Sequence, residues 1–373
     1  MNNHYQSSNQ NHPYTQIPSF YEQNDEIDLK ELFLALWQGK WIIILTTLVF
    51  AIGAIAYALT AQEWWSSSAK IAVPQVQDFT EYQSQVKQYQ PIFDVYQEDG
   101  TMLVNNYLDG LVMPQQLFQS FVMAFESNKN KRTFLDNNAV FQDFKNKLDA
   151  DADESTRRLY SEWFNKLTAS QPDKSNQNII ELKVQATTKL DSYNMLQNYI
   201  TYISDIVRRD ALQNLNAVIT SKINELLQQK TALSLQAKQN LEVEIQRAEY
   251  ALQIAKAAKV DTPIQNLGEK EIFPINLGSA AIEAKINALK TISNLNVIEP
   301  RLQQVDSKLT LINNTKINPD IEFATFQYLD DVQIPLNRDK PKRALIAVLG
   351  ALLGGMLGVA IVLVRFAFRK EPK

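Results

Sequence analysis

The residues best suited to chemistry are three aspartates at alternating positions within the acidic run 149–154. Such spacing is typical of calcium-binding loops. An EF-hand that began at Asp151 would place Glu162 at its twelfth position, but its sixth position requires glycine and holds Thr156. We therefore interpret the run as a solvated loop or the start of a helix, and we predict no metal site.

Other reactive groups are scarce. The chain has no cysteine, and its two histidines are His4 and His12, so thiolate and imidazole chemistry are excluded from the ordered part. No glycine lies between Gly110 and Gly268, which excludes a glycine-rich phosphate loop in that region. The net charge of −4 gives no basic surface for nucleic acid. We predict a protein that is not an enzyme, with no cofactor and no nucleic-acid partner.

A second pattern is formed by Gly350, Gly354 and Gly358, which repeat every four residues and so share one helix face. Close approach at small residues drives helix association in lipid. We predict that these glycines pack against the first apolar segment, which offers Gly53 and nearby alanines, or against another subunit. The alternative is that glycine is simply common in membrane helices.

The glycine pattern lies in the second of two uncharged segments of the chain. Trp41–Leu59 and Ala344–Val364 have 19 and 21 residues, and 19 residues of helix span about 28 Å, close to the thickness of a hydrocarbon core. A buried helix of a soluble core is the alternative, but such helices seldom run this long with every face apolar. We predict transmembrane helices 41–59 and 344–364.

The remaining chain divides around these two helices. Residues 1–24 are polar and predicted to be a disordered cytoplasmic tail. Residues 25–40 fit an amphipathic helix at the membrane surface, or merely the start of the first membrane helix. Residues 60–343 form the predicted periplasmic domain, and residues 365–373 are too few for a signalling domain.

Charge bias does not settle the orientation, because six Lys and Arg residues flank the membrane on the terminal side and five on the loop side. The long polar loop and the lack of cysteine favour cytoplasmic termini.

Alternating apolar residues predict strands at Ser67–Pro74 and Asn178–Ala186, and Phe323–Tyr328 is a candidate third strand. Residues 80–170 are expected to be helices and loops with a phenylalanine-rich core. The fold class is therefore α+β, with a small sheet-and-helix base.

A long helix is predicted at about residues 189–260, where proline and glycine are absent. It would measure roughly 105 Å and must protrude or break into a hairpin. Helical tracts at Ile282–Ile292 and Leu302–Leu311 could cover part of its apolar seam, and neighbouring subunits the rest. The polar tract Leu226–Asn240 could contact sugars, or be a solvated surface. The residues that we predict to pack the stalk or an oligomer are Leu212, Leu215, Ile219, Leu226 and Leu241.

Several stretches resemble the Wzz-type polysaccharide co-polymerases, the family of O-antigen chain-length determinants. The entry to the first span, Glu26–Trp41, is similar to the amino-terminal signature of that family. Asp339–Ala344 is followed by the family spacing, in which Pro341-Lys342 and eleven further residues precede Gly354 and then Gly358. In the loop, Ile245–Ala258 and Leu277–Glu283 look like members for very long chains. One family proline is replaced near Arg338, which leaves Pro335 and Pro341.

This resemblance implies an inner-membrane protein with a periplasmic domain, a protruding helix and a ring-like homo-oligomer. It implies a non-catalytic regulator of the modal length of lipopolysaccharide O-antigen, acting with a separate membrane polymerase. Membrane lipid is a further expected partner, and the polysaccharide itself is a candidate ligand. Pro335, Pro341 and Lys342 are expected to form the junction between the periplasmic domain and the membrane. A two-span adaptor of a capsule or polysaccharide export system shares this architecture and is the alternative.

Overall fold

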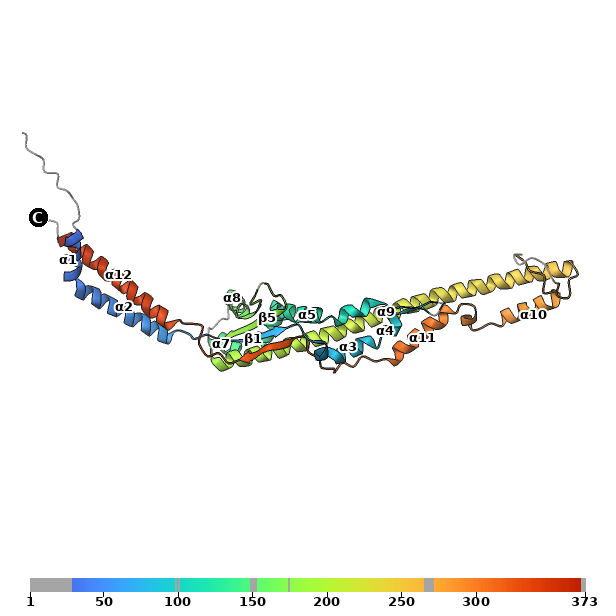
Figure 1. Cartoon of the computed structure of the whole chain (residues 1–373), viewed down its shortest axis with the longest axis horizontal. Coiled ribbons are helices and arrows are strands. Elements are labelled where there is room, and N and C mark those ends of the chain that lie inside the picture. Colours follow the sequence, from blue (N-terminus) through green and yellow to red (C-terminus); the bar gives the residue numbers. More distant parts are fainter. Residues whose placement is uncertain are drawn as a thin grey trace, which may run out of the picture. The chain divides into compact units, whose positions relative to one another are not determined.

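The computed structural model describes residues 29–97, 99, 101–147, 153–173, 175–264 and 272–369. These residues form two compact units, one within 1–62 and 340–373 and the other within 63–339 (Figure 1). We call the first unit the membrane hairpin and the second the large domain. The predicted tail 1–24, and positions 149 and 151 of the acidic run, lie outside the described residues.

The membrane hairpin consists of α1 (Leu29–Gln38), α2 (Lys40–Thr60) and α12 (Arg343–Arg369). Within the described residues, α2 and α12 are the helices long and apolar enough to cross a membrane, and little of either is buried inside the chain. A core helix of a soluble protein would be mostly buried, so this exposure fits a lipid surrounding. α1 is separate from α2, because the helix is interrupted at Gly39.

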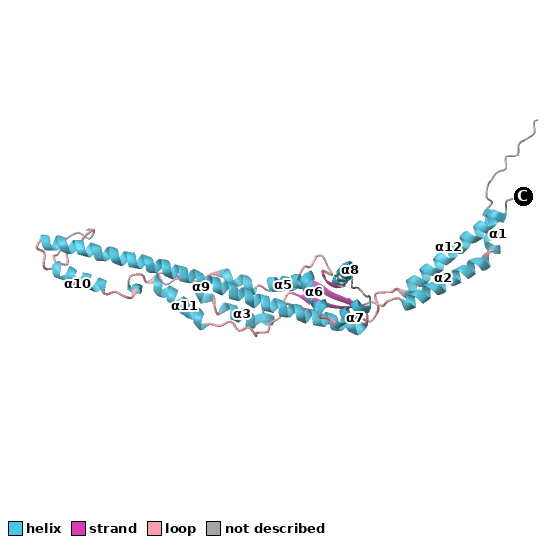
Figure 2. Cartoon of the chain, turned by 180° about the vertical axis from the view of Figure 1, so that it is seen from behind, coloured by secondary structure: helices cyan, strands magenta, loops and turns pink. Residues whose placement is uncertain are grey.

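The large domain contains an antiparallel sheet, drawn in magenta in Figure 2. Its four strands lie in the order β4-β5-β1-β6. Its strands are β1 (Trp65–Ala72), β4 (Leu167–Ser170), β5 (Ile179–Ala186) and β6 (Gln327–Gln333). β1 and β5 pair with Ala69 opposite Leu182 and Ile71 opposite Ile180. These apolar residues alternate with polar ones along each strand and are buried, so the alternation sets the register.

Short elements connect β1 to β4, and together they supply much of the core. They are η1 (Val76–Phe79), α3 (Thr80–Lys87), α4 (Gln90–Phe93), β2 (Val95–Tyr96), β3 (Met102–Leu103), η2 (Asn106–Val112), α5 (Pro114–Glu126), α6 (Asn128–Asp136), α7 (Ala139–Lys147) and α8 (Asp153–Phe164).

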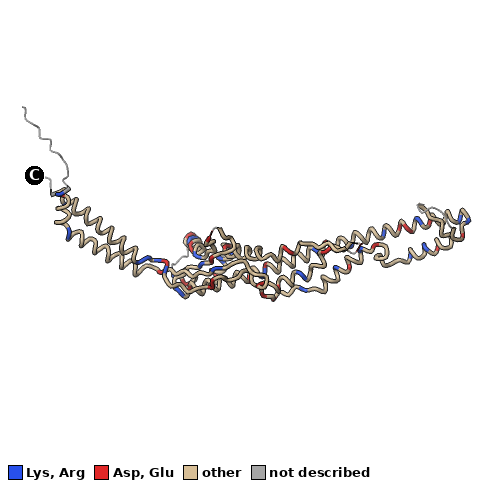
Figure 3. Tube along the Cα trace, viewed as in Figure 1, with Lys and Arg blue, Asp and Glu red and all other residues tan. Residues whose placement is uncertain are grey.

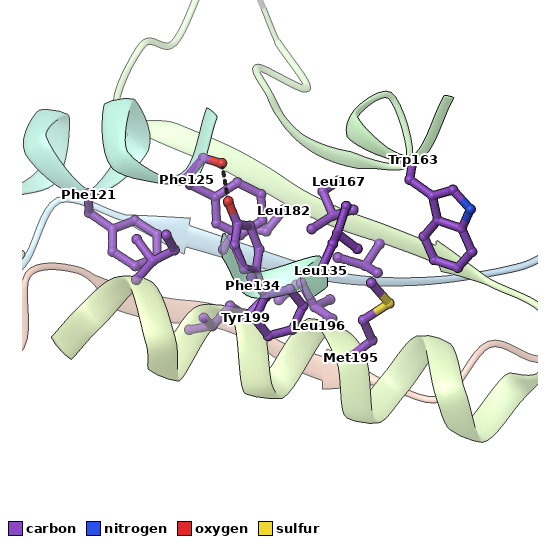
Figure 4. Close-up of a cluster of buried hydrophobic side chains, with 14 of the residues drawn as sticks. Phe121, Phe125, Phe134, Leu135, Trp163, Leu167, Leu182, Met195, Leu196 and Tyr199 are labelled. Carbon is purple, nitrogen blue, oxygen red and sulfur yellow. Dashed lines mark hydrogen bonds between the residues drawn. The ribbon is translucent and has the colours of Figure 1, made fainter. Parts of the chain in front are cut away.

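The core of the base joins the sheet to α5, α6, α8 and α9. Figure 4 shows Tyr199, Leu196 and Met195 of α9 close to Leu182 of β5 and Phe125 of α5. The Tyr199 hydroxyl donates a hydrogen bond of 2.7 Å to the backbone oxygen of Phe125, which satisfies a buried polar group. Burial strongly raises the pKa of Tyr199, so the phenol stays neutral and keeps its proton for this bond.

The longest element is α9 (Lys189–Ala257), a single helix of 69 residues. Thr188 caps its start by accepting a hydrogen bond of 3.1 Å from the backbone N–H of Asp191. At its end, the N–H of Val260 donates to the oxygen of Ala255 at 2.9 Å, and Lys259 adopts a left-handed φ of 56°. This is the geometry of a Schellman cap. With no proline or glycine inside, the helix extends about 104 Å.

Three later elements lie along α9: α10 (Ser279–Lys290), η3 (Leu295–Val297) and α11 (Arg301–Asn314). Figures 1 and 2 show α10 and α11 beside α9, and we call α9–α11 the stalk. The expected fold class is therefore confirmed: two membrane helices flank a domain with a small sheet, helices and a long helix.

One strand differs from the prediction. The third strand begins at Gln327 rather than at Phe323, because Phe323 and Phe326 are buried in two different apolar clusters. Their side chains therefore pack in these two clusters and do not alternate between two faces as those of a strand would.

Candidate functional site

Within the membrane hairpin, α2 and α12 touch along the face that carries Gly350, Gly354 and Gly358. A Cβ atom at Gly354 would lie 2.8 Å from the Cα of Thr47, and one at Gly358 would lie 2.8 Å from the Cα of Ile43. A Cβ atom at Gly350 would collide with the side chain of Ala54. Any larger residue at these positions would force the helix backbones apart.

Gly39 makes a similar close approach at the other end of the hairpin. A Cβ atom there would lie 2.5 Å from the side chain of Val362 in α12, which is itself buried. The break between α1 and α2 therefore packs tightly on α12. Figure 3 shows that Lys and Arg lie near the ends of the hairpin and that its middle is uncharged.

The chain enters and leaves the large domain through a polar cluster that we call the junction cluster: Glu63, Ser66, Gln185, Arg338 and Asp339. Arg338 Nη1 donates to Glu63 Oε1 at 2.8 Å, and Gln185 Nε2 donates to Asp339 Oδ2 at 2.7 Å. Ser66 also donates to Asp339 Oδ2, and the N–H of Asp339 donates to the oxygen of Trp64 at 2.9 Å. These bonds fasten the first residues of the domain to its last ones.

The predicted junction residues lie close to Arg338 and Asp339 of this cluster in the sequence. Pro335 is half-buried and follows β6, whereas Pro341 and Lys342 precede α12 and belong to the hairpin unit. Sequence reasoning identified these three residues but missed the junction cluster. Its partners lie up to 275 positions apart in the chain, and no local pattern links them.

The predicted stalk residues divide into two groups. Leu212, Leu215, Ile219 and Leu226 are buried in one apolar cluster with residues of α3, α4, η2 and α11. Leu241 is half-buried and lies between that cluster and a second one near the end of α9, where α9 alanines pack on α10. Much of the seam is therefore covered by the chain itself.

Ion pairs align the stalk helices. Lys230 of α9 lies 2.7 Å from Asp306 of α11, and Lys290 of α10 lies 2.6 Å from Glu249 of α9. Lys308 of α11 donates a hydrogen bond of 2.5 Å to the backbone oxygen of Asp94. Burial, with Lys222 nearby, lowers the pKa of Lys308. Exposed ion pairs of this kind add little to the free energy of folding. Their main effect is to set the alignment of α10 and α11 along α9.

The outer side of α9 carries apolar residues that sequence reasoning did not single out. They become visible only once the covering helices are placed: Leu227, Leu235, Val243, Tyr250 and Ile254. Leu235 is 58% exposed and Tyr250 is 54% exposed. We take these side chains as a candidate surface for contact with another molecule.

One open groove of the large domain measures about 690 Å³ and lies between α9 and residues 317–322, with Arg208, Arg209 and Asp320 among its lining residues. Within the described ranges, no group of three or more His, Cys, Asp or Glu side chains could hold a metal ion. Asp153 and Glu154 of the acidic run lie in the first turn of α8.

Two family models match the chain. The one described as "Chain length determinant protein" matches residues 25–145, and the one described as "G-rich domain on putative tyrosine kinase" matches residues 302–367. The first match covers α1, α2 and the start of the large domain. The second covers α11, β6 and most of α12, including its glycines.

Relatives extend this match to nearly the whole chain. The ECA polysaccharide chain length modulation protein of Escherichia coli K12 is 26% identical over 92% of this chain and 96% of its own. The chain length determinant protein of Salmonella typhimurium LT2 is 27% identical over 94% and 95%. The ferric enterobactin transport protein FepE of Escherichia coli K12 is 24% identical over 96% and 94%.

A solved structure agrees. A full-length bacterial polysaccharide co-polymerase aligns with a TM-score of 0.65 and 26% identity, over 93% of this chain and 100% of its own. The O-antigen chain-length regulator of Shigella flexneri shares the fold, with a TM-score of 0.51 and 20% identity over 74% and 100%.

Fold and site together define a two-span membrane scaffold with a helical stalk. The chain is similar to the Wzz family of chain length determinants, whose model matches residues 25–145, and to relatives and a co-polymerase structure over nearly its whole length. Its two apolar helices and this similarity indicate an inner-membrane protein with a periplasmic domain.

Replacing Gly354 with Leu should separate α2 from α12 and weaken their association by about 1–2 kcal/mol, while the protein still inserts. Thermal unfolding of the full chain in detergent measures the loss. Gly355→Leu is the matched control, because a Cβ atom at Gly355 would meet only the Thr47 hydroxyl at 3.5 Å. Equal unfolding temperatures for the two variants would contradict the packing role.

Replacing Asp339 with Ala should remove the acceptor for Ser66 and Gln185 in the junction cluster. Hydrogen bonds to a charged group are worth about 1.5–3 kcal/mol each when buried, and this cluster is partly exposed, so we expect a loss of about 1–2 kcal/mol. Chemical denaturation of the full chain, compared with Asp331→Ala at an exposed position of β6, is the measurement. A variant as stable as the control would show that the cluster is dispensable.

Proposed function

We propose that this protein is a non-catalytic regulator of polysaccharide chain length, and that it sets the modal length of lipopolysaccharide O-antigen. The observation that carries the proposal is the match to chain length determinant and modulation proteins over more than nine-tenths of both chains. The co-polymerase structure supports the same conclusion through the fold.

The arrangement of the chain is consistent with an organising role. The residues that sequence and structure single out are packing groups, namely the glycines of α12, the junction cluster and the stalk seam. Among the described residues, no group of three or more His, Cys, Asp or Glu side chains could hold a metal ion. A separate membrane polymerase would then supply the chemistry, and this protein would act on it or on the growing polymer.

The orientation that we propose places both termini in the cytoplasm. A polar domain of this size between two spans crosses the membrane largely regardless of its charge. α1 would then lie at the cytoplasmic surface, where its apolar face and Trp37 suit the membrane boundary.

Self-association is part of the proposal. The exposed residues of α9, with Leu227 and Leu235 in the middle of the stalk, would be covered by the stalk of a neighbouring copy. A helix that is about 104 Å long offers such contact far from the base, and closed symmetric rings are a common outcome of repeated contacts.

An export adaptor is the second candidate function, because it shares two spans and a large domain. One relative carries a transport name, whereas the others are named for chain length. The two functions differ in what their loss does to the surface polymer.

Deletion of the gene should leave surface polysaccharide present but without a preferred length, because polymerisation would continue unregulated. Complementation with the full chain should restore the modal band. Gel separation of lipopolysaccharide from both strains is the measurement, and complementation with Gly355→Leu serves as control. Complete loss of surface polymer in the deletion strain would favour the export adaptor, and an unchanged ladder would reject both roles.

Replacing Leu235 with Glu should lower the oligomeric state, because a charge would enter an apolar contact between stalks while the protomer core is untouched. Light scattering of the purified full chain in detergent reports the mass. Gln236→Glu adds the same charge to the neighbouring exposed position and should leave the mass unchanged. If Leu235→Glu also leaves it unchanged, self-association does not use this face of the stalk.

A further inference from the structure

A polar groove lies between α5 and α9 of the large domain, where α5 runs beside α9 (Figure 2). Its volume is about 500 Å³, within the range of small-ligand sites. Leu117 of α5 and Val207 of α9 are among its lining residues, and both are buried in the apolar clusters of the domain. The core therefore holds the two helices that form the walls of the groove.

Polar side chains line both walls at helical spacing. Gln116 and Ser120 are four residues apart on α5, and Asp210 and Asn214 are four residues apart on α9. Side chains four apart share one face of a helix, so a polar face of α5 meets a polar face of α9 across the groove. Within the part of the chain that the structure describes, these four side chains make no hydrogen bond or ion pair. They are therefore available to a ligand.

The kinds of polar group limit the ligand to one chemical class. The amides and the serine hydroxyl can both donate and accept hydrogen bonds, whereas the carboxylate of Asp210 accepts them. Among the described residues that line the groove, none is Lys, Arg or His, so an anionic ligand would meet Asp210 without a compensating cation. A hydrocarbon would bury these polar groups without partners. A neutral molecule with many hydroxyl groups satisfies them.

An apolar contact beside these groups suits a sugar ring. Met123 of α5 also lines the groove, and its side chain is 67% exposed. The C–H face of a pyranose can cover such a side chain while the hydroxyls of the ring reach the amides. The groove therefore offers the two kinds of contact that a saccharide needs.

We propose that this groove binds a segment of neutral polysaccharide, with sugar hydroxyls paired to Gln116, Asp210 and Asn214. The inference rests on the proposed function, because the polymer whose length is regulated would be the ligand. The other groove along α9 has Arg208 and Arg209 among its lining residues. Those cations would suit an acidic polymer, so the two grooves make different predictions.

Isothermal titration calorimetry of the full chain in detergent tests the proposal. The probe is the polysaccharide released by mild acid from the lipopolysaccharide of the source strain. We expect the wild type to bind it and Asn214→Ala to bind about fivefold more weakly, the effect of one lost hydrogen bond. Asn216→Ala is the matched control, because Asn216 is an exposed residue of α9 that lines the other groove. No binding by the wild type, or weakening by Asn216→Ala alone, would overturn the proposal.

Filling the groove is a second test. Ser120→Trp should abolish binding, whereas Gln119→Trp adds the same ring at an exposed position of α5 outside the groove and should retain it. Equal affinities of these two variants would refute the site. The affinity of the wild type should be the same at 0.15 M and about 1 M salt, because a neutral ligand is not screened. A large loss at high salt would refute the neutral class.

These results separate the groove from the proposed function. If deletion of the gene removes the preferred polymer length but the purified chain binds no polysaccharide, the inference about the groove is wrong and the regulatory role stands. If the chain binds polysaccharide through the groove but deletion leaves the ladder unchanged, the regulatory role is wrong and the groove stands.

Discussion

The close approach of α2 and α12 is the contact that holds the membrane hairpin together, and it joins the two stretches of chain between which the large domain lies in the sequence. Three glycines of α12 let the two backbones meet, and Arg343 reaches the oxygen of Ala58 from the start of α12. In the large domain, β1 follows α2 and pairs with β6, which precedes α12. The junction cluster adds side-chain bonds between the same two stretches. Each unit therefore joins the amino-terminal stretch of the chain to the carboxy-terminal stretch through contacts of its own.

The apolar surface of α9 must be covered by other contacts. A helix of 69 residues has more apolar surface than the base can cover, and an isolated helix gains little from propensity alone. The chain returns along α9 as α10, η3 and α11, and two apolar clusters with several ion pairs join them. What remains exposed, from Leu227 to Ile254, is the part that the protomer does not cover.

Patterns of short range predicted much of this fold. The uncharged segments indicated α2 and α12, the lack of proline and glycine indicated α9, and alternation indicated β1 and β5. The four-residue glycine repeat predicted which positions of α12 touch α2, although the role of these glycines in function remains a proposal. Contacts between residues far apart in the chain could not be predicted. No local sequence pattern links Asp339 to Gln185 or Lys230 to Asp306. The predicted start of the third strand at Phe323 was wrong, because Phe323 and Phe326 are buried in two separate apolar clusters.

Glycines of the two membrane helices show why residue type alone was insufficient to predict the contact. Gly350, Gly354 and Gly358 meet backbone or side chain of α2, whereas Gly53 faces open space. Sequence reasoning placed Gly53 on the opposing face, yet Ala54 and the threonines of α2 occupy that face. The regulator that we propose would act through such geometry. Substitutions that displace helices or the junction would then change its output more than the removal of any single polar group on its surface.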